Sequence, residues 1–128
     1  MLVLNNTCDL QPSRSQFVTV APVLDFALFS ESVIACKGAD RARNYLHDAR
    51  ANKIHEMLWL PGFASFKEGA VVFLDRVGAV SAKLYEDALK ERRRVVSFSQ
   101  NGFYFLLIKL TNHIARMESD EVARLEIH

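Results

Sequence analysis

The stretch LVLN at residues 2–5, followed by FVTVAPV at residues 17–23, decides which folds are open to this chain. Both runs are rich in β-branched and large apolar residues, which fit the pleated, half-buried surface of a sheet. Two such runs on either side of a short polar segment predict neighbouring β-strands. The polar segment contains Thr7, Cys8 and Asp9, close to a strand end where a scaffold commonly presents functional side chains.

Length and composition favour one soluble globular domain. The 128 residues correspond to a single domain, 1–128, in which 50% of residues are hydrophobic and 24% are charged. The formal net charge of +1 provides no overall field to attract nucleic acid or an anionic membrane. Two cysteines, Cys8 and Cys36, are too few for a disulfide framework, so we expect a cytoplasmic protein. We expect neither a signal peptide nor a membrane span, because no apolar run approaches the roughly 20 residues that a span needs.

The segment from about 25 to 53 has the pattern of a helical insertion between strands. Asp25 can cap a short helix over residues 26–32, and ADRARNYLHDARA at 39–51 has a thin apolar stripe at helical spacing. Glycine and proline further along mark the ends or bends of strand-like runs. The predicted strands are 2–5, 16–23, 54–60, 70–76, 77–82 and 94–98, with a short helix within 83–94.

The clearest periodic segment predicts a helix from about 101 to 117. Its large apolar residues recur at intervals of three, four and seven, which indicates one face packed against a core. We expect Phe103, Leu106, Leu110 and Ile114 to form this face, and residues 118–128 to be a peripheral tail. Together these elements predict an α+β fold, with the helix packed on a strongly bent antiparallel sheet.

The opening strands and the later segment GAVVFLDRVGAVSAKLY, residues 69–85, resemble the MazF/PemK-type toxin family. In that family a "VVLS" strand precedes a "V-V-P-V-T" strand, and a "VV-L-D-Q-V-R-T-V" strand pair precedes a basic stretch and the last helix. The resemblance covers about residues 2–23 and 69–117. It implies a small SH3-like barrel or half-barrel, a homodimer and cleavage of single-stranded RNA.

The chain departs from this family at the residues that carry its chemistry. Family nucleases use an arginine before the Asp-Gln pair and a Thr or Ser after Pro-Val, whereas Phe73 and Leu24 occupy those positions here. Asp75 is retained, with Arg76 as a neighbouring substitute for the missing cation. A cation is needed to stabilise charge that develops on the scissile phosphate. We therefore expect no ribonuclease activity.

A candidate binding site lies in the loop of Thr7, Cys8 and Asp9, together with Asp75 and Arg76. A nucleophilic cysteine needs a nearby cation or imidazole to hold it as a thiolate, and an adjacent carboxylate does the opposite. The structural alternative for the loop is a half-buried cysteine beside an aspartate that caps a turn.

A second candidate is the basic edge of the carboxy-terminal helix. His113 and Arg116 share a face there with Lys109 and Asn112, and this face would suit a phosphate or an acidic partner. The alternative, which we favour, is a solvated face opposite the core stripe.

No metal and no cofactor are expected. The pair His55-Glu56 begins an H-E-x-x-H motif, but Trp59 stands where the second histidine would be. The basic runs within 37–53 and 90–94 are diluted by acidic residues and lack aromatic neighbours, so we favour a solvated surface over nucleic-acid binding there.

Two classes of function remain open. The first is a non-catalytic binding module that contacts a protein or RNA partner. We expect it to be a homodimer, because Tyr104, Ile108 and the loop containing Phe63 and Phe66 add apolar surface outside the core stripe. The second is a sequence-specific single-strand endoribonuclease toxin with a rearranged active site. A redox or hydrolytic enzyme built on Cys8 is a third, less favoured class.

Overall fold

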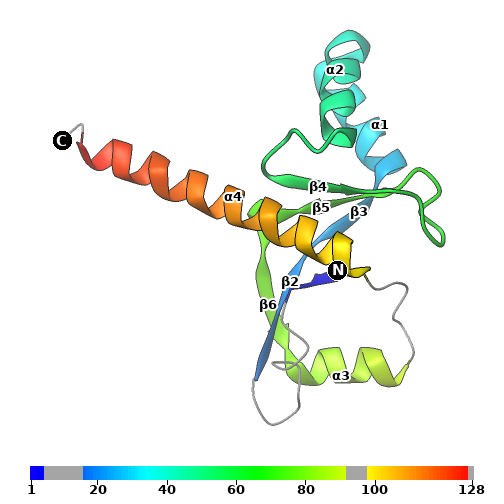
Figure 1. Ribbon diagram of the computed structural model, residues 1–128. Coiled ribbons are helices and arrows are strands. Elements are labelled where there is room, and N and C mark those ends of the chain that lie inside the picture. The colour runs from blue at the N-terminus through cyan, green and yellow to red at the C-terminus, as the bar shows by residue number, and fades with distance from the viewer. Residues whose placement is uncertain (5–15, 92–97, 127–128) are drawn as a thin grey trace.

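The computed structural model describes residues 1–4, 16–91 and 98–126. Within these residues the chain is α+β, with four α-helices and two small antiparallel sheets (Figure 1). The strands are β1 (Leu2–Val3), β2 (Phe17–Ala21), β3 (Val23–Asp25), β4 (Met57–Leu60), β5 (Ala70–Phe73) and β6 (Gly78–Ser81). The helices are α1 (Phe26–Lys37), α2 (Ala39–Arg50), α3 (Ala82–Lys90) and α4 (Gln100–Glu126), with a 3₁₀ turn η2 (Leu74–Arg76).

A bent two-stranded ribbon joins the two sheets. The first sheet has the strand order β1-β2-β6 and the second has β3-β5-β4. Because β2 pairs with β6 and β3 pairs with β5, one side of the ribbon is β2 followed by β3, and the other side is β5 followed by β6. Pro22 stands at the bend, and its carbonyl accepts a hydrogen bond from the N–H of Phe73 at 3.0 Å. The opposite strand inserts η2 at this point, and extra residues on one side of a strand pair bend the ribbon.

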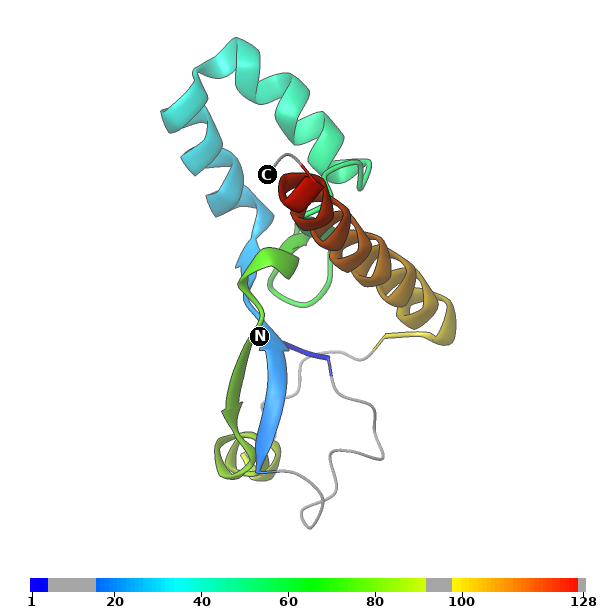
Figure 2. The same cartoon turned by 90° about the vertical axis from the view of Figure 1, so that its left-hand side faces the viewer.

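The second sheet lies between two helical layers. Its side chains alternate between faces, so that Val71 packs with Phe26 beneath α1 and α2, whereas Val72 packs with Leu58 and Leu106 beneath α4. Figure 2 shows α3 at the far end of the β2–β6 strand pair, away from α4. The two hydrophobic cores therefore share this sheet, and the orientation of α4 is fixed by the second of them.

Local capping explains where the inserted helices begin and end. The carboxylate of Asp25 accepts the N–H of Ala27 at 3.0 Å, as the sequence predicts, although α1 continues to Lys37 rather than ending near residue 32. Gly38 has a φ of 80°, a conformation that favours glycine, and it separates α1 from α2. The two helices form a hairpin on the second sheet.

The described strands lie largely within the predicted strand ranges, but they do not form the closed barrel that was one of the two expected forms of the sheet. The described strands form two open sheets and no closed barrel. The free edge of β4 is covered instead, because the side-chain amide of Asn52 accepts the N–H of Trp59 at 2.7 Å and donates to its carbonyl at 3.3 Å. The predicted strand at 94–98 falls mostly outside the described residues.

Helix α4 is longer than the sequence pattern indicates, since it continues past residue 117 to Glu126. None of the helices in the described part of the chain combines the length and apolarity that crossing a bilayer requires.

Candidate functional site

The predicted site residues do not form one described cluster. Thr7, Cys8 and Asp9 lie outside the described residues, and of Arg116 only its place in α4 is described. Asp75 and Arg76 are exposed on η2.

The surroundings of Asp75 and Arg76 are structural rather than catalytic in character. The Arg76 guanidinium stacks over the ring of Phe73, 4.9 Å from its centroid, and Phe73 packs its ring against Phe29 in the core. Burial raises the pKa of the Tyr45 hydroxyl, and the negative charges of Glu56 and Asp75 raise it further. Asp75 therefore lies close enough to α2 for its charge to act on Tyr45. In the described ranges, no group of three His, Cys, Asp or Glu side chains could hold a metal ion.

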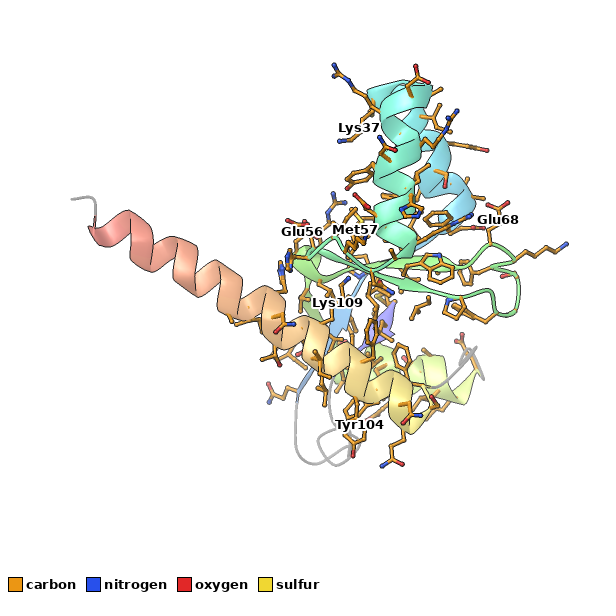
Figure 3. All side chains as sticks on the ribbon, turned by 45° about the horizontal axis from the view of Figure 1, so that its top comes forward. Lys37, Glu56, Met57, Glu68, Tyr104 and Lys109 are labelled. Carbon is orange, nitrogen blue, oxygen red and sulfur yellow. The ribbon has the colours of Figure 1, made fainter. Side chains whose placement is uncertain are left out.

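His113 and Lys109, which the sequence analysis placed on a solvated face, are both buried. They lie with Leu106 on the side of α4 that faces the second sheet. Figure 3 shows Lys109 on this side of the helix and Tyr104 on the opposite side. The predicted basic helical edge is therefore largely an internal surface.

A polar anchor accounts for the burial of Lys109. Its Nζ donates to the backbone carbonyl of Asn52 at 2.7 Å and lies 3.4 Å from the Asn52 Oδ1. Asn52 follows the end of α2 with a φ of 56°, and its side chain holds the Trp59 backbone of β4. The long aliphatic stem of a lysine packs against apolar groups while its amine reaches a polar partner. Three distant segments, α2, β4 and α4, are thus joined at Asn52.

Burial also changes the acid–base chemistry of this amine. Removal from water lowers the pKa of Lys109 from 10.5 to about 8, and the carboxylate of Glu56 opposes this change by favouring the charged form. Since Lys109 is only 8% exposed and its amine bonds to Asn52, we assign the amine a structural role in holding α4.

With Lys109 and His113 turned inward, the opposite side of α4 is apolar and exposed. Phe103 and Ile114, which were predicted to belong to the core, are 37% and 50% exposed, and Leu110 is only partly buried. Tyr104 and Ile108 are 52% and 61% exposed. We call this surface the outer face of α4; its large apolar members are Phe103, Tyr104, Phe105, Leu107, Ile108 and Ile114.

The outer face carries no charge along four helical turns. Every exposed side chain from Asn101 to Ala115 is uncharged, because Lys109 is buried and the next charged residue is Arg116. Beside this face, Gly102 and Phe105 help to line a mostly apolar pocket of about 310 Å³ between the start of α4 and β4. Its other apolar walls are Leu58, Leu60, Pro61 and Phe98.

Comparison with known proteins gives no relative from which a function could be transferred. No family model, no curated protein and no solved structure matches the chain. The resemblance to MazF/PemK-type toxins therefore remains an expectation from the sequence.

Proposed function

We propose that the protein is a non-catalytic protein-binding module that docks its partner on the outer face of α4. The observation that carries this proposal is the run of uncharged, solvent-exposed positions from Asn101 to Ala115, which includes six large apolar side chains. A surface helix ordinarily has charged and polar residues on the side opposite its core stripe. Large contiguous apolar patches on soluble proteins mark interaction sites.

The size of the patch fits a protein partner. Phe103, Tyr104 and Phe105 are about half exposed, and three such rings offer on the order of 250 Å² of apolar surface. The aliphatic members bring the total to about 400 Å². Exposed apolar patches of about 300–600 Å² on a monomer are often functional.

Two observations favour binding over the endoribonuclease alternative. Phe73, at the position where the toxin family has its arginine, packs its partly buried ring against the core, and Arg76 stacks on that ring. His113, the candidate acid–base group, is buried on the inner side of α4. The imidazole of His113 is therefore not presented at the surface, and the exposed guanidinium of Arg76 is held against an aromatic ring.

Photo-crosslinking in cells tests whether a protein occupies this face. We expect a benzophenone amino acid at Ile108 to yield a covalent adduct with one defined protein, identified by mass spectrometry. The adduct should disappear when Tyr104→Asp places a charge on the same face, because a buried unpaired carboxylate opposes docking.

Ile34 is the matched control for this experiment. It is also an exposed isoleucine on a helix, 47% exposed, but Glu31 and Lys37 lie one turn away on either side. The proposal fails if position 108 gives no protein adduct, or gives the same adducts as position 34.

A further inference from the structure

We infer that the pocket between the start of α4 and β4 anchors the partner by taking up one of its aromatic side chains, a ring without charge. This inference rests on the proposed function and specifies the chemistry by which the partner is recognised. The pocket adjoins the outer face of α4, because Phe105, which is 46% exposed, belongs to both surfaces. A partner that covers the outer face therefore meets the pocket at this ring.

The pocket has a buried floor and an open mouth. Leu58, which forms part of its lining, is 1% exposed, whereas Pro61 and Phe105 in the same lining are exposed. An apolar cavity of about 150 Å³ is large enough to hold benzene. The volume of about 310 Å³ found here therefore admits a group as large as the indole ring of a tryptophan.

A glycine provides the space at this end of α4. A Cβ atom at Gly102 would lie 3.1 Å from Cδ1 of Phe98 and 3.4 Å from Oγ of Ser99, and both residues belong to the pocket wall. Glycine is a poorer helix former than alanine, so its presence in the first turn of α4 requires a local reason. The close approach of Phe98 supplies this reason, and a side chain at position 102 would begin against two walls of the pocket.

The polar side chains of the lining are already hydrogen-bonded within the chain. The amide of Asn52 accepts the N–H of Trp59 at 2.7 Å and donates to its carbonyl at 3.3 Å. The Oγ of Ser99 accepts the N–H of Gly102 at 3.2 Å. None of the described side chains that line the pocket is charged. A charged group would therefore lose its water in the pocket without gaining an ionic partner, which opposes its entry.

Aromatic walls favour an aromatic occupant over an aliphatic one. Phe98 and Phe105 both line the pocket, and pairs of aromatic rings attract each other beyond the effect of the area they bury. Large aromatic side chains seated in apolar pockets are also among the residues that contribute most to binding at protein interfaces. The feature recognised on the partner is therefore an exposed tryptophan or phenylalanine.

A titration with indole, followed by amide NMR shifts, tests the pocket itself. The purified protein should carry Ile108→Asp, which keeps the outer face uncovered. We expect saturable shifts at the amides of Leu60 and Gly102, with a dissociation constant on the order of 1 mM. Phe105→Ala removes one wall and should weaken indole binding at least about 5-fold.

Phe103→Ala is the matched control for this titration. Phe103 is a phenylalanine on the same helix, 37% exposed, and it does not belong to the pocket lining, so its loss should leave indole binding unchanged. The absence of saturable shifts, or equal weakening by the two substitutions, would overturn the inference.

The photo-crosslink at Ile108 tests whether the partner uses the pocket. Gly102→Leu places a side chain in the pocket and should lower the yield of adduct at least about 10-fold. Asn101→Leu adds the same side chain at an exposed position outside the pocket and should retain the adduct, with circular dichroism to show that both variants are folded. Saturating indole in a cell lysate should lower the yield without any change to the chain.

The outcomes separate this inference from the proposed function. An adduct that persists both in Gly102→Leu and in the presence of saturating indole would overturn the anchoring inference and leave the docking function standing. If the protein with an unaltered pocket gives no adduct at position 108, the docking function fails and the anchoring inference fails with it.

Discussion

Replacing Leu106 by alanine is expected to lower the free energy of unfolding by about 2–5 kcal/mol. Leu106 is 3% exposed and packs against Leu58, Val72 and Leu74, so truncation leaves a cavity that these side chains fill only in part. Ile114→Ala removes a similar volume from the opposite side of α4 and should change the same quantity by less than about 0.5 kcal/mol. Chemical denaturation measures both values.

Both substitutions should be made in an Ile108→Asp background, which keeps the protein free of any contact made through the outer face. The unfolding energy then reports only on packing within one subunit. A large loss for Ile114→Ala and a small loss for Leu106→Ala would mean that α4 presents its other side to the sheet.

Stability should rise with pH from about pH 8 because of Lys109. The folded state holds the proton of this amine only up to a pKa of about 8, whereas the unfolded state holds it to the ordinary value of 10.5. Between these values the unfolded chain binds more protons, so raising the pH stabilises the folded protein. The free-energy cost of burying the charged amine is therefore fully present below pH 8. A shift of this size corresponds to roughly 1–3 kcal/mol after allowance for partial solvation.

Lys109→Met is the variant that isolates this effect. It should remove most of the rise in unfolding free energy that the natural protein shows between about pH 8 and pH 10. The comparison should stop at that point, because the raised pKa of Tyr45 favours the protonated folded state and so destabilises it at higher pH. Equal pH profiles for the two proteins would show that the amine is not held away from water.

The sequence predicted the sheet and the insertion because their signals are local. The apolar runs of 17–23 and 70–82, with Pro22 and Gly78 as breaks, indicate strands that bend, and the structure has strands in both runs; the break in the second run is the 3₁₀ turn η2, just before Gly78. Asp25 before Phe26 predicted the start of α1 for an equally local reason, namely the hydrogen bond of a helix cap. The open form of the two sheets follows from contacts between distant segments and could not be deduced in this way.

The orientation of α4 was predicted only in part, because apolar residues occur on all sides of it. Leu106 is buried and Leu110 packs against the same core, whereas Phe103 and Ile114 are exposed. Periodicity alone fits several faces in FYFLLIKL, residues 103–110, and the hydrophobic stripe chosen from it includes Phe103 and Ile114. The face that is actually buried packs Leu106 into the second core and bonds Lys109 to Asn52, which are 57 residues apart in the chain. A lone lysine within an apolar helical run was the available signal, but its partner lay too far away in sequence to be identified.

Sedimentation equilibrium tests most directly whether the outer face of α4 joins two copies of the protein. At tens of micromolar, we predict twice the chain mass of 14.5 kDa for the natural protein. For Ile108→Asp we predict the single-chain mass. Loss of a central interface residue raises the dissociation constant of a dimer at least about 30-fold. The matched variant Ile34→Asp should remain a dimer. A natural protein that sediments as one chain, or a dimer that persists in Ile108→Asp, would contradict this account.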